Sequence, residues 1–396
     1  MKIIGIDDVE EKVSTLNRKK LIYTIIISAI LIIFIILFCV YLGNRNFRDF
    51  IDKYVLMKNV TENNVTAITL DDSENNYIYT YDKYISVLNQ NILTLYNNSA
   101  NKEYELTVEI TEPLVDINGR FLLMAEKNKQ KIYLISGNNI AWEKELEGNI
   151  SKVSVNKNGY VSVILTGTAY KSIIQTFDNT GKELFKTYLS SSIAMDSDIS
   201  NDNKYLSFVE VSTNGTLASS IIKTISIQTA QANPSESIVY TSEALIDTVA
   251  LNLKYQDSNR LVCMCDNGIY VTHNNKTEVI ANFNEDNKKI SFANIELKNN
   301  AYRISEKTSL LSTESTVEII NVSNAKANIY TLDSIIKEVY SYDEVIALNL
   351  GSEVHFIGTN GWLIKKYISS QEVRKIIINS NFAGIVYRDK IEIINL

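Results

Sequence analysis

From about residue 65 to its end, the sequence repeats one pattern of four short apolar runs separated by turn residues. The clearest unit extends from Ile150 to Leu189 and includes the tight-turn pair Asn158-Gly159. Its four runs are Lys152–Val155, Tyr160–Leu165, Ile173–Phe177 and Glu183–Leu189. Four strands in about 40 residues are typical of one blade of a β-propeller. Because one blade cannot bury its two apolar faces alone, a series of such units predicts a ring.

The same pattern recurs on both sides of this unit, and Asn118-Gly119 and Asn360-Gly361 mark further tight turns. The other complete units are predicted at Tyr77–Ile110, Leu114–Leu146, Ile193–Thr241, Thr248–Phe283, Ile290–Leu332 and Lys337–Ile368. In the unit at Ile193–Thr241, the third connection is longer and contains Pro234.

The two ends of the repeated region complement each other. The chain finishes with only three strands, Lys375–Ile378, Ala383–Tyr387 and Lys390–Ile394, whereas Val65–Leu70 is a strand without a unit. If residues 65–70 complete the last blade, the ring closes and neither terminus leaves an open edge. Residues 65–396 then form an all-β propeller of eight blades, each of about 41 residues. Seven blades is the alternative, because blade edges taken from one sequence are uncertain.

A charge-free apolar segment, Leu21–Leu42, precedes the repeats. As a helix it is long enough to cross the roughly 30 Å hydrocarbon layer of a membrane. A cleaved signal peptide is the competing interpretation, but its apolar core is usually only about 7–15 residues long and precedes a small-residue cleavage site. No such site follows Cys39. We therefore predict one transmembrane helix at residues 21–43, which anchors the chain in the lipid bilayer.

The charges beside this segment predict its orientation. Arg18, Lys19 and Lys20 lie directly before it, against Arg45 and Arg48 after it. By the positive-inside rule, residues 1–20 form a cytoplasmic tail and residues 65–396 lie outside the cytoplasm, at the cell membrane. Between them, residues 44–60 are predicted to form an amphipathic juxtamembrane stalk, with apolar residues at helical spacing. These are Phe47, Phe50, Ile51, Tyr54 and Val55.

Composition excludes one class of function. The formal net charge is −7, and the propeller region has no basic stripe. Nucleic-acid binding needs clustered lysines and arginines that neutralise phosphates, so we exclude a nucleic-acid partner.

Cysteine and histidine do not form a chemical motif. Cys263 and Cys265 lie two apart in a predicted strand, so their side chains share one face. That spacing favours two buried core thiols over a disulfide or a zinc site. The two histidines, His273 and His355, belong to different predicted blades, and no HExxH motif or phosphate-binding glycine loop occurs.

One acidic segment has the spacing with which calcium loops begin. Its oxygen-bearing residues are Asp196, Asp198, Ser200 and Asp202. The later positions do not fit a calcium loop, because Asn201 replaces the required glycine and Ser207 replaces the bidentate glutamate. We interpret the segment as the turn between the first two strands of a blade.

Two local patterns resemble known propellers. The hairpin Phe177-Asp178-Asn179-Thr180-Gly181-Lys182-Glu183-Leu184 resembles the repeat of quinoprotein-type (PQQ-like) propellers, in which Trp142 of the neighbouring blade is the docking aromatic. Ser200-Asn201-Asp202-Asn203-Lys204-Tyr205-Leu206 is similar to a turn of WD40-like propellers and of those of the translocation-protein kind. The whole layout resembles uncharacterised membrane-anchored propeller proteins of AT-rich Gram-positive bacteria. The resemblance does not carry quinoprotein activity, which needs an adjacent cysteine pair or other specific cofactor contacts, together with calcium carboxylates and a base near the ring axis. Here Met264 separates the two cysteines, and no motif places convergent acids.

These observations predict no catalytic, cofactor-binding or metal-binding residue and no cofactor. We expect a non-catalytic scaffold or assembly factor at the cell envelope, whose partners are envelope or membrane proteins. The alternative is an enzyme or small-ligand sensor with its site in the central funnel, since propeller sites come from scattered loops. Convergent carboxylates or histidines at the inner strand ends favour the alternative, whereas an apolar or charged strip across one face favours the scaffold.

The orientation can be tested by proteolysis. Protease added to intact cells stripped of their wall is expected to degrade the propeller and to spare residues 1–20, because only the propeller lies outside. Protection of the propeller in intact cells, followed by its digestion in lysed cells, would contradict this orientation.

Overall fold

The structure is a computed structural model, and it describes residues 18–56, 58–61, 65–71, 75–212, 215–243, 245–284, 289–308, 313–369 and 371–396. The chain divides into two compact units, Met1–Asn59 and Val60–Leu396.

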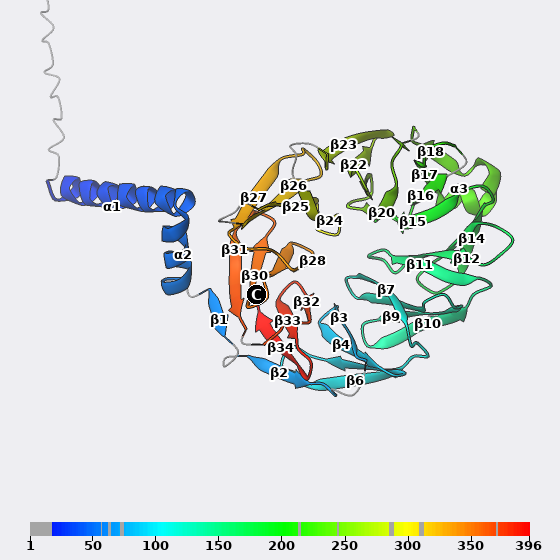
Figure 1. Ribbon diagram of the computed structural model, residues 1–396, viewed down its shortest axis with the longest axis horizontal. Coiled ribbons are helices and arrows are strands. Elements are labelled where there is room, and N and C mark those ends of the chain that lie inside the picture. The colour runs from blue at the N-terminus through cyan, green and yellow to red at the C-terminus, as the bar shows by residue number, and fades with distance from the viewer. Residues whose placement is uncertain are drawn as a thin grey trace, which may run out of the picture. The chain divides into compact units, whose positions relative to one another are not determined.

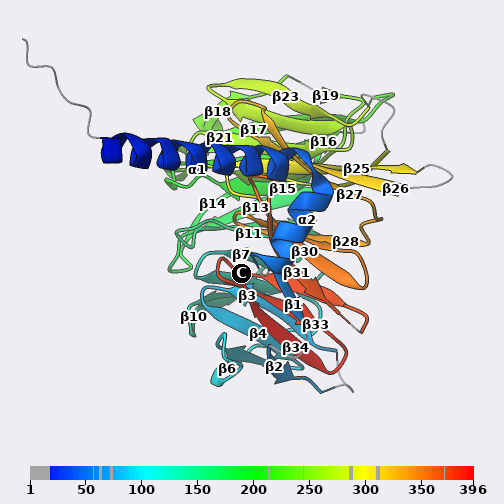
Figure 2. The same cartoon turned by 90° about the vertical axis from the view of Figure 1, so that its left-hand side faces the viewer.

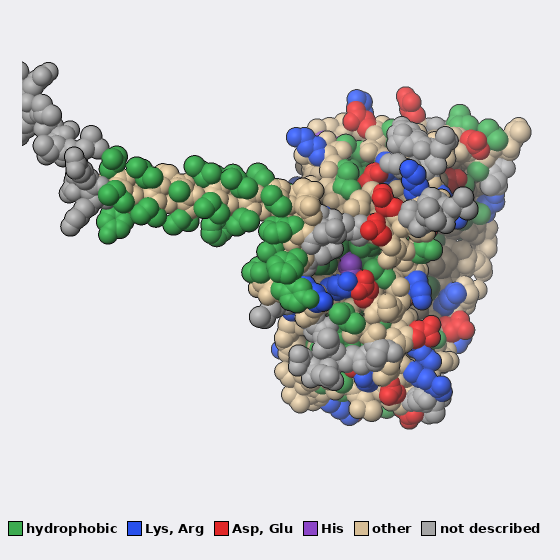
Figure 3. Space-filling model, turned by 60° about the vertical axis from the view of Figure 1, so that its left-hand side comes forward, with side chains coloured by type: hydrophobic (Ala, Val, Ile, Leu, Met, Phe, Trp, Pro, Cys, Tyr) green, Lys and Arg blue, Asp and Glu red, His purple; other side chains and the backbone are tan. Residues whose placement is uncertain are grey.

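The described part of the first unit contains two helices. Helix α1 (Arg18–Gly43) confirms the predicted long apolar helix, and its segment Lys20–Gly43 is long and apolar enough to cross a membrane. Apolar side chains surround it along its length (Figure 3). The Asn44 side chain caps α2 (Arg45–Tyr54) by accepting a hydrogen bond from the Phe47 N–H at 3.0 Å. The buried Asp52 of α2 accepts a hydrogen bond from the Tyr41 hydroxyl at 2.8 Å, which links α2 to the last turn of α1.

The second unit is a propeller of eight antiparallel blades, as the sequence predicted, and Figure 1 shows them arranged in a ring around a central axis. We call the region along this axis, beside the first strands of the blades, the central channel. In chain order, blades 1 to 4 contain the following strands: β3 (Tyr77–Tyr81), β4 (Tyr84–Asn89), β5 (Ile92–Tyr96) and β6 (Lys102–Thr107); β7 (Pro113–Asn118), β8 (Phe121–Glu126), β9 (Lys131–Ser136) and β10 (Asn139–Glu145); β11 (Asn149–Val155), β12 (Val161–Thr166), β13 (Ser172–Phe177) and β14 (Glu183–Leu189); β15 (Ile193–Ile199), β16 (Tyr205–Ser212), β17 (Ser219–Ser226) and β18 (Ile238–Thr241).

Blades 5 to 8 continue the series, and Figure 2 shows the same propeller after a quarter turn. Their strands are β20 (Ala250–Tyr255), β21 (Arg260–Cys265), β22 (Gly268–His273) and β23 (Lys276–Asn282); β24 (Lys289–Asn294), β25 (Asn300–Thr308), β26 (Thr313–Asn321) and β27 (Ala327–Leu332); β28 (Glu338–Tyr342), β29 (Val345–Asn349), β30 (Glu353–Gly358) and β31 (Leu363–Ile368), with β1 (Asn59–Thr61) beside β31; and β32 (Lys375–Ile378), β33 (Phe382–Val386), β34 (Lys390–Asn395) and β2 (Thr66–Thr69).

Each interface between neighbouring blades holds one apolar cluster, and the described residues form eight such clusters. Because successive side chains of a strand point to opposite faces of the sheet, each blade places apolar side chains on both of its faces. On β8, Leu122 and Met124 pack toward blade 1, whereas Leu123 and Ala125 pack toward blade 3. A blade's core is therefore completed only by its two neighbours.

The ring closes where the sequence predicted. Strand β2 pairs with β34 in antiparallel register, with Thr66 opposite Ile393 and Thr69 opposite Lys390. The buried Ile68 side chain packs in one cluster with Ile391 of blade 8 and Ile85 of blade 1. Strand β2 thus contributes backbone hydrogen bonds to blade 8 and a buried side chain to the apolar cluster between blades 8 and 1.

Two details add to the sequence prediction. The long connection in blade 4 contains helix α3 (Ile227–Ala232) and a 3-10 turn at Pro234–Glu236, and a short strand, β19 (Leu245–Ile246), pairs with β17. Trp142 of blade 2 lies against Gly181 of blade 3, whose φ is +82°; a Cβ atom there would lie 2.8 Å from Trp142 Cγ. Only glycine fits this contact.

Ring closure makes a stability prediction. Deletion of residues 65–70 removes β2 and leaves one edge of β34 unpaired. This deletion is expected to lower the melting temperature and to promote aggregation. Ile68→Ala is expected to cost about 2–5 kcal/mol of unfolding free energy, because it opens a cavity between blades 8 and 1. Thr69→Ala, at an exposed position of the same strand, is the control and should cost less than about 0.5 kcal/mol. Equal melting curves for all four proteins would contradict the pairing.

Candidate functional site at the mouth of the central channel

Polar side chains occur at alternate positions of the innermost strands of blades 3, 4 and 5. A register shift precedes each pair, and such a bulge redirects the side chains that follow it. The pairs are Lys152 and Ser154, Asp196 and Asp198, and Asn252 and Lys254. Asp116 of β7 in blade 2 and Glu296, which follows β24 in blade 6, complete the group, which we call the channel cluster.

The carboxylates of the channel cluster join neighbouring blades. Asp116 Oδ2 accepts a hydrogen bond from the Val155 N–H of blade 3 at 2.7 Å. The Asp196 and Asp198 carboxylates accept hydrogen bonds from the N–H groups of Leu253 and Tyr255 in blade 5, at 2.9 and 2.7 Å. These acids therefore satisfy backbone donors on the inner edge of the next blade.

Two lysines lie among these acids. Lys152 Nζ is 3.7 Å from Asp196 Oδ2. Lys254 Nζ is 4.0 Å from Asp116 Oδ1 and 3.8 Å from Glu296 Oε2. Burial lowers the pKa of Lys254, but the surrounding carboxylates outweigh burial and raise it overall. Lys254 thus keeps its charge inside the channel.

Burial acts on the acids in the opposite sense. It raises the pKa of Asp196 to about 7 and that of Asp198 to about 6, because a charged carboxylate loses its hydration there. The cluster has two lysines against four carboxyl groups. It is neutral when Asp196 and Asp198 are protonated and gains two negative charges when both lose their protons.

A cavity of about 540 Å³ opens onto this cluster at the channel mouth. Its lining comes from blades 2 to 7 and includes Lys157, Lys254, Glu296, Lys298 and Tyr342. Side-chain amides hold the turns around it. Asn118 Nδ2 donates to the Val155 carbonyl at 3.2 Å, Asn158 Nδ2 to the Asn201 carbonyl at 2.9 Å, and Gln256 Nε2 to the Ile295 carbonyl at 2.7 Å. Each bond joins one blade to the next, so the rim is fixed by the ring itself.

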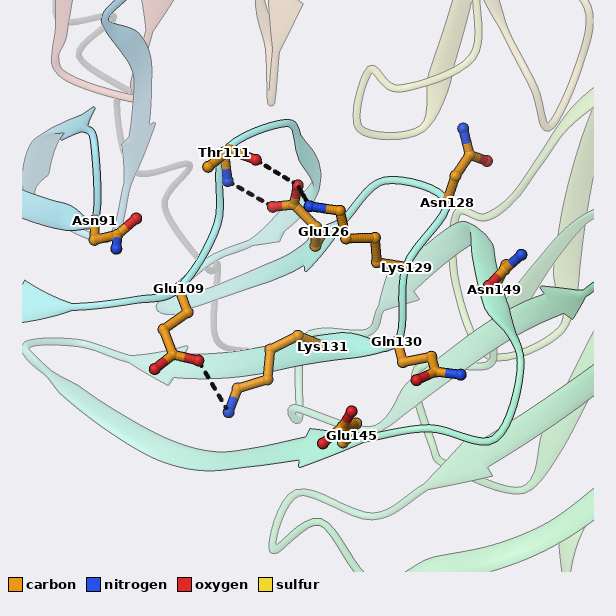
Figure 4. Close-up of a pocket in the computed structure, with 10 residues that line it drawn as sticks. All are labelled: Asn91, Glu109, Thr111, Glu126, Asn128, Lys129, Gln130, Lys131, Glu145 and Asn149. Carbon is orange, nitrogen blue, oxygen red and sulfur yellow. Dashed lines mark hydrogen bonds and ion pairs between the residues drawn. The ribbon is translucent and has the colours of Figure 1, made fainter.

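A second cavity, of about 570 Å³, lies beside blade 2, and Figure 4 shows its polar lining. The buried Glu126 carboxylate accepts hydrogen bonds from the Thr111 N–H at 2.5 Å and the Thr111 hydroxyl at 2.6 Å, and Lys129 Nζ lies 3.1 Å away. Burial raises the pKa of Glu126, but these hydrogen bonds outweigh burial and lower it overall. Glu126 therefore serves to hold the connection between blades 1 and 2.

The structure confirms the turn interpretation of the acidic segment. Ser200 Oγ donates to Asp202 Oδ1 at 2.7 Å and accepts a hydrogen bond from the Tyr205 N–H at 3.0 Å, which closes the turn between β15 and β16. Asp196 and Asp198 lie in the strand before it and belong to the channel cluster. The sequence analysis missed Asp116, Lys152, Lys254 and Glu296. Their signal was the presence of polar residues at alternate positions of predicted first strands.

The cysteines and histidines lie as predicted. Cys263 and Cys265 are free, buried thiols whose sulfur atoms are 3.8 Å apart, and Cys39 is exposed on α1. His273 lies in blade 5 and His355 lies in blade 7. The hydroxyl of Tyr330, which lies on β27 of blade 6, is 2.9 Å from His355 Nδ1. Within the described part of the chain, no three His, Cys, Asp or Glu side chains are grouped so that they could hold a metal ion.

Comparison with known protein families shows to which family the chain belongs. The model of a family of unknown function, DUF5711, matches residues 83–396. The chain belongs to this family. The match begins at the turn before β4, so β2 and β3 lie outside the DUF5711 region. Comparison with the curated proteins finds no match.

Solved structures resemble this DUF5711 chain at low identity. A eukaryotic initiation factor is 11% identical, with a TM-score of 0.50, over 83% of this chain and 87% of that one. BamB from Moraxella catarrhalis is 13% identical, with a TM-score of 0.49, over 84% and 97%. Hsv2 from Kluyveromyces lactis is 9% identical, with a TM-score of 0.43, over 71% and 93%. At 11% identity the likeness to the initiation factor shows a shared fold alone.

The raised pKa values predict how stability depends on pH. Between about pH 4 and about pH 7 the folded protein keeps the Asp196 proton that the unfolded chain releases. Stability is therefore greatest at the acidic end of this window and falls as pH rises, by up to about 1.4 kcal/mol per pH unit for one proton. Denaturant unfolding across this range should show the fall, and Asp196→Asn should reduce its slope, most clearly between about pH 6 and about pH 7, where Asp198 no longer contributes. The exposed Asp247→Asn is the control; an equal flattening in both variants would contradict the assignment.

Proposed function

We propose that this chain is a membrane-anchored, non-catalytic scaffold whose propeller docks other proteins of the cell envelope. In this proposal α1 is an uncleaved anchor, Arg18, Lys19 and Lys20 keep its N-terminal end in the cytoplasm, and the propeller stands outside. The support for the anchor is the charge-free segment Leu21–Leu42 of α1 and the excess of basic residues at the N-terminal end of this segment.

The observation that carries the docking function is an apolar patch on one face of the propeller. In an antiparallel blade, the connection from the second to the third strand and the connection to the next blade lie at the same end. Exposed apolar residues of blades 3, 4 and 5 gather at this end, 39–68% exposed, and we call them the apolar patch. They are Tyr170, Tyr188, Ile193, Leu217, Ile246 and Leu251.

Contacts between the segments of the apolar patch support its continuity. The rings of Tyr170 and Tyr188 lie 4.8 Å apart. Ile246 lies on β19, opposite Ser219 of β17, and the Ser220 hydroxyl of the same strand accepts a hydrogen bond from the Ala250 N–H at 2.9 Å. Single exposed apolar residues are ordinary, but a group across neighbouring elements is typical of a protein interface, where tyrosine is also enriched.

The channel cluster supports a non-catalytic role. General acid–base chemistry needs a carboxylate whose oxygens can reach a substrate. Three of the four carboxylates of the channel cluster, those of Asp116, Asp196 and Asp198, instead accept backbone hydrogen bonds from the next blade. Their arrangement serves the ring, which favours the scaffold over the enzyme.

Site-specific photo-crosslinking tests the docking function. A photoreactive amino acid at Ile246 or Leu251 of the full-length, membrane-bound protein is expected to give discrete crosslinked products, and Leu217→Glu should abolish them by placing a charge in the patch. The same amino acid at Lys157, on the opposite face, is the control. Equal crosslinking from both faces, or products that persist in the Leu217→Glu variant, would contradict docking at the apolar patch.

A further inference from the structure

The Lys254 ammonium group has hydrogen-bonding capacity that the described residues do not use. Its side chain is 15% exposed and lines the channel-mouth cavity. The nearest carboxylate oxygens, at 3.8 and 4.0 Å, are too far for hydrogen bonds. Among the described residues no other acceptor lies within hydrogen-bonding distance of Lys254 Nζ. Because an ammonium group carries three donors and no acceptor, Lys254 can donate hydrogen bonds to a ligand in the cavity.

Glu296 presents the complementary capacity. Its Oε2 atom lies 3.8 Å from Lys254 Nζ, and its side chain is 43% exposed toward the same cavity. The Glu296 carboxylate accepts no hydrogen bond from any described residue. An ionised carboxylate only accepts hydrogen bonds. The cavity therefore places a donor-only group and an acceptor-only group side by side.

The charge around the cavity favours an uncharged occupant. Asp116 and Glu296 flank Lys254, and Asp343 and Glu344 lie 3.8 and 3.1 Å from Lys298 Nζ. A phosphate or carboxylate ligand would face these acids, and a cationic ligand would face the three lysines that line the cavity, Lys157, Lys254 and Lys298. A hydroxyl group satisfies both neighbours at once, because it accepts from an ammonium group and donates to a carboxylate. A carbonyl group accepts only, so it satisfies Lys254 alone.

We propose that the channel-mouth cavity is a binding site for a hydroxyl-rich, uncharged ligand, namely a sugar or short glycan. Lys254 and Glu296 bind one ligand hydroxyl between them, and Lys157 and Tyr342 border the site from blades 3 and 7. The volume of about 540 Å³ lies within the range of small-molecule sites. The amide bonds between the surrounding turns keep the site preformed, which reduces the entropy lost on binding. This site is separate from the apolar patch.

Ligand-detected NMR on the full chain tests the proposal, in a detergent without a sugar headgroup. The probes are maltotriose and chitotriose, with inorganic phosphate as the anionic comparison. We expect saturable binding of at least one of the two sugars. Glu296→Gln should weaken it about tenfold or more, because the acceptor of the ligand hydroxyl loses its negative charge and the hydrogen bond becomes a weaker, neutral one. Lys157→Ala, which leaves the channel cluster intact, should weaken it less.

Glu145→Gln is the matched control, because Glu145 lines the other polar cavity and makes the same chemical change there. Unchanged melting temperatures would show that each variant is folded. The proposal is overturned if neither sugar binds, if Glu145→Gln weakens binding as much as Glu296→Gln, or if phosphate competes with the sugar. Because the apolar patch lies elsewhere, loss of crosslinking there would leave this result unaffected.

Discussion

The pairing of β2 with β34 is the interaction on which the rest of the propeller depends. Every blade shares its two apolar faces with its neighbours, so a ring with one missing strand leaves an unpaired edge and an incomplete core. Hydrogen bonds add to the apolar contacts at the interface between blades 7 and 8. Between blades 7 and 8, the Tyr367 hydroxyl lies 2.7 Å from the Tyr387 hydroxyl and donates to the buried Glu392 of β34. Strand β34, which pairs with β2, is therefore joined to blade 7 as well.

Closure of the ring also creates the channel. Eight first strands meet at the centre only when the ring is complete, and their backbone donors face inward, where they need acceptors. Asp116, Asp196 and Asp198 supply acceptors from the preceding blade. Their negative charge is then matched by Lys152 and Lys254, and one of these lysines is left facing the cavity. The proposed ligand site thus follows from the way in which the backbone N–H groups of the inner strands are hydrogen-bonded. The Lys254 ammonium group balances the charge of the acids that accept these bonds, and it can also donate hydrogen bonds to a ligand.

The sequence predicted the fold because the repeat carries two independent signals, the turn pairs and the alternation of apolar residues. Val65–Leu70 could be assigned to the last blade because only that blade lacked a strand. The channel cluster could not be predicted, because alternation does not reveal which blade a polar side chain meets. Asp196 and Asp198 bind backbone groups 57 residues further along the chain. Local spacing matched only the start of a calcium loop, so the segment was interpreted as a turn, and the ring explains the role of the two aspartates. Helix α3 was missed because its six residues are too few for a helical period.

Hydrogen exchange of the full-length protein, followed by mass spectrometry, tests the central claim of ring closure most directly. If β2 belongs to the cooperative core, peptides that cover residues 65–70 exchange as slowly as those of β33 and are released only by global unfolding. Exchange of residues 65–70 at the rate of an unstructured peptide, while β33 stays protected, would show that the ring is complete without β2 and would contradict the account.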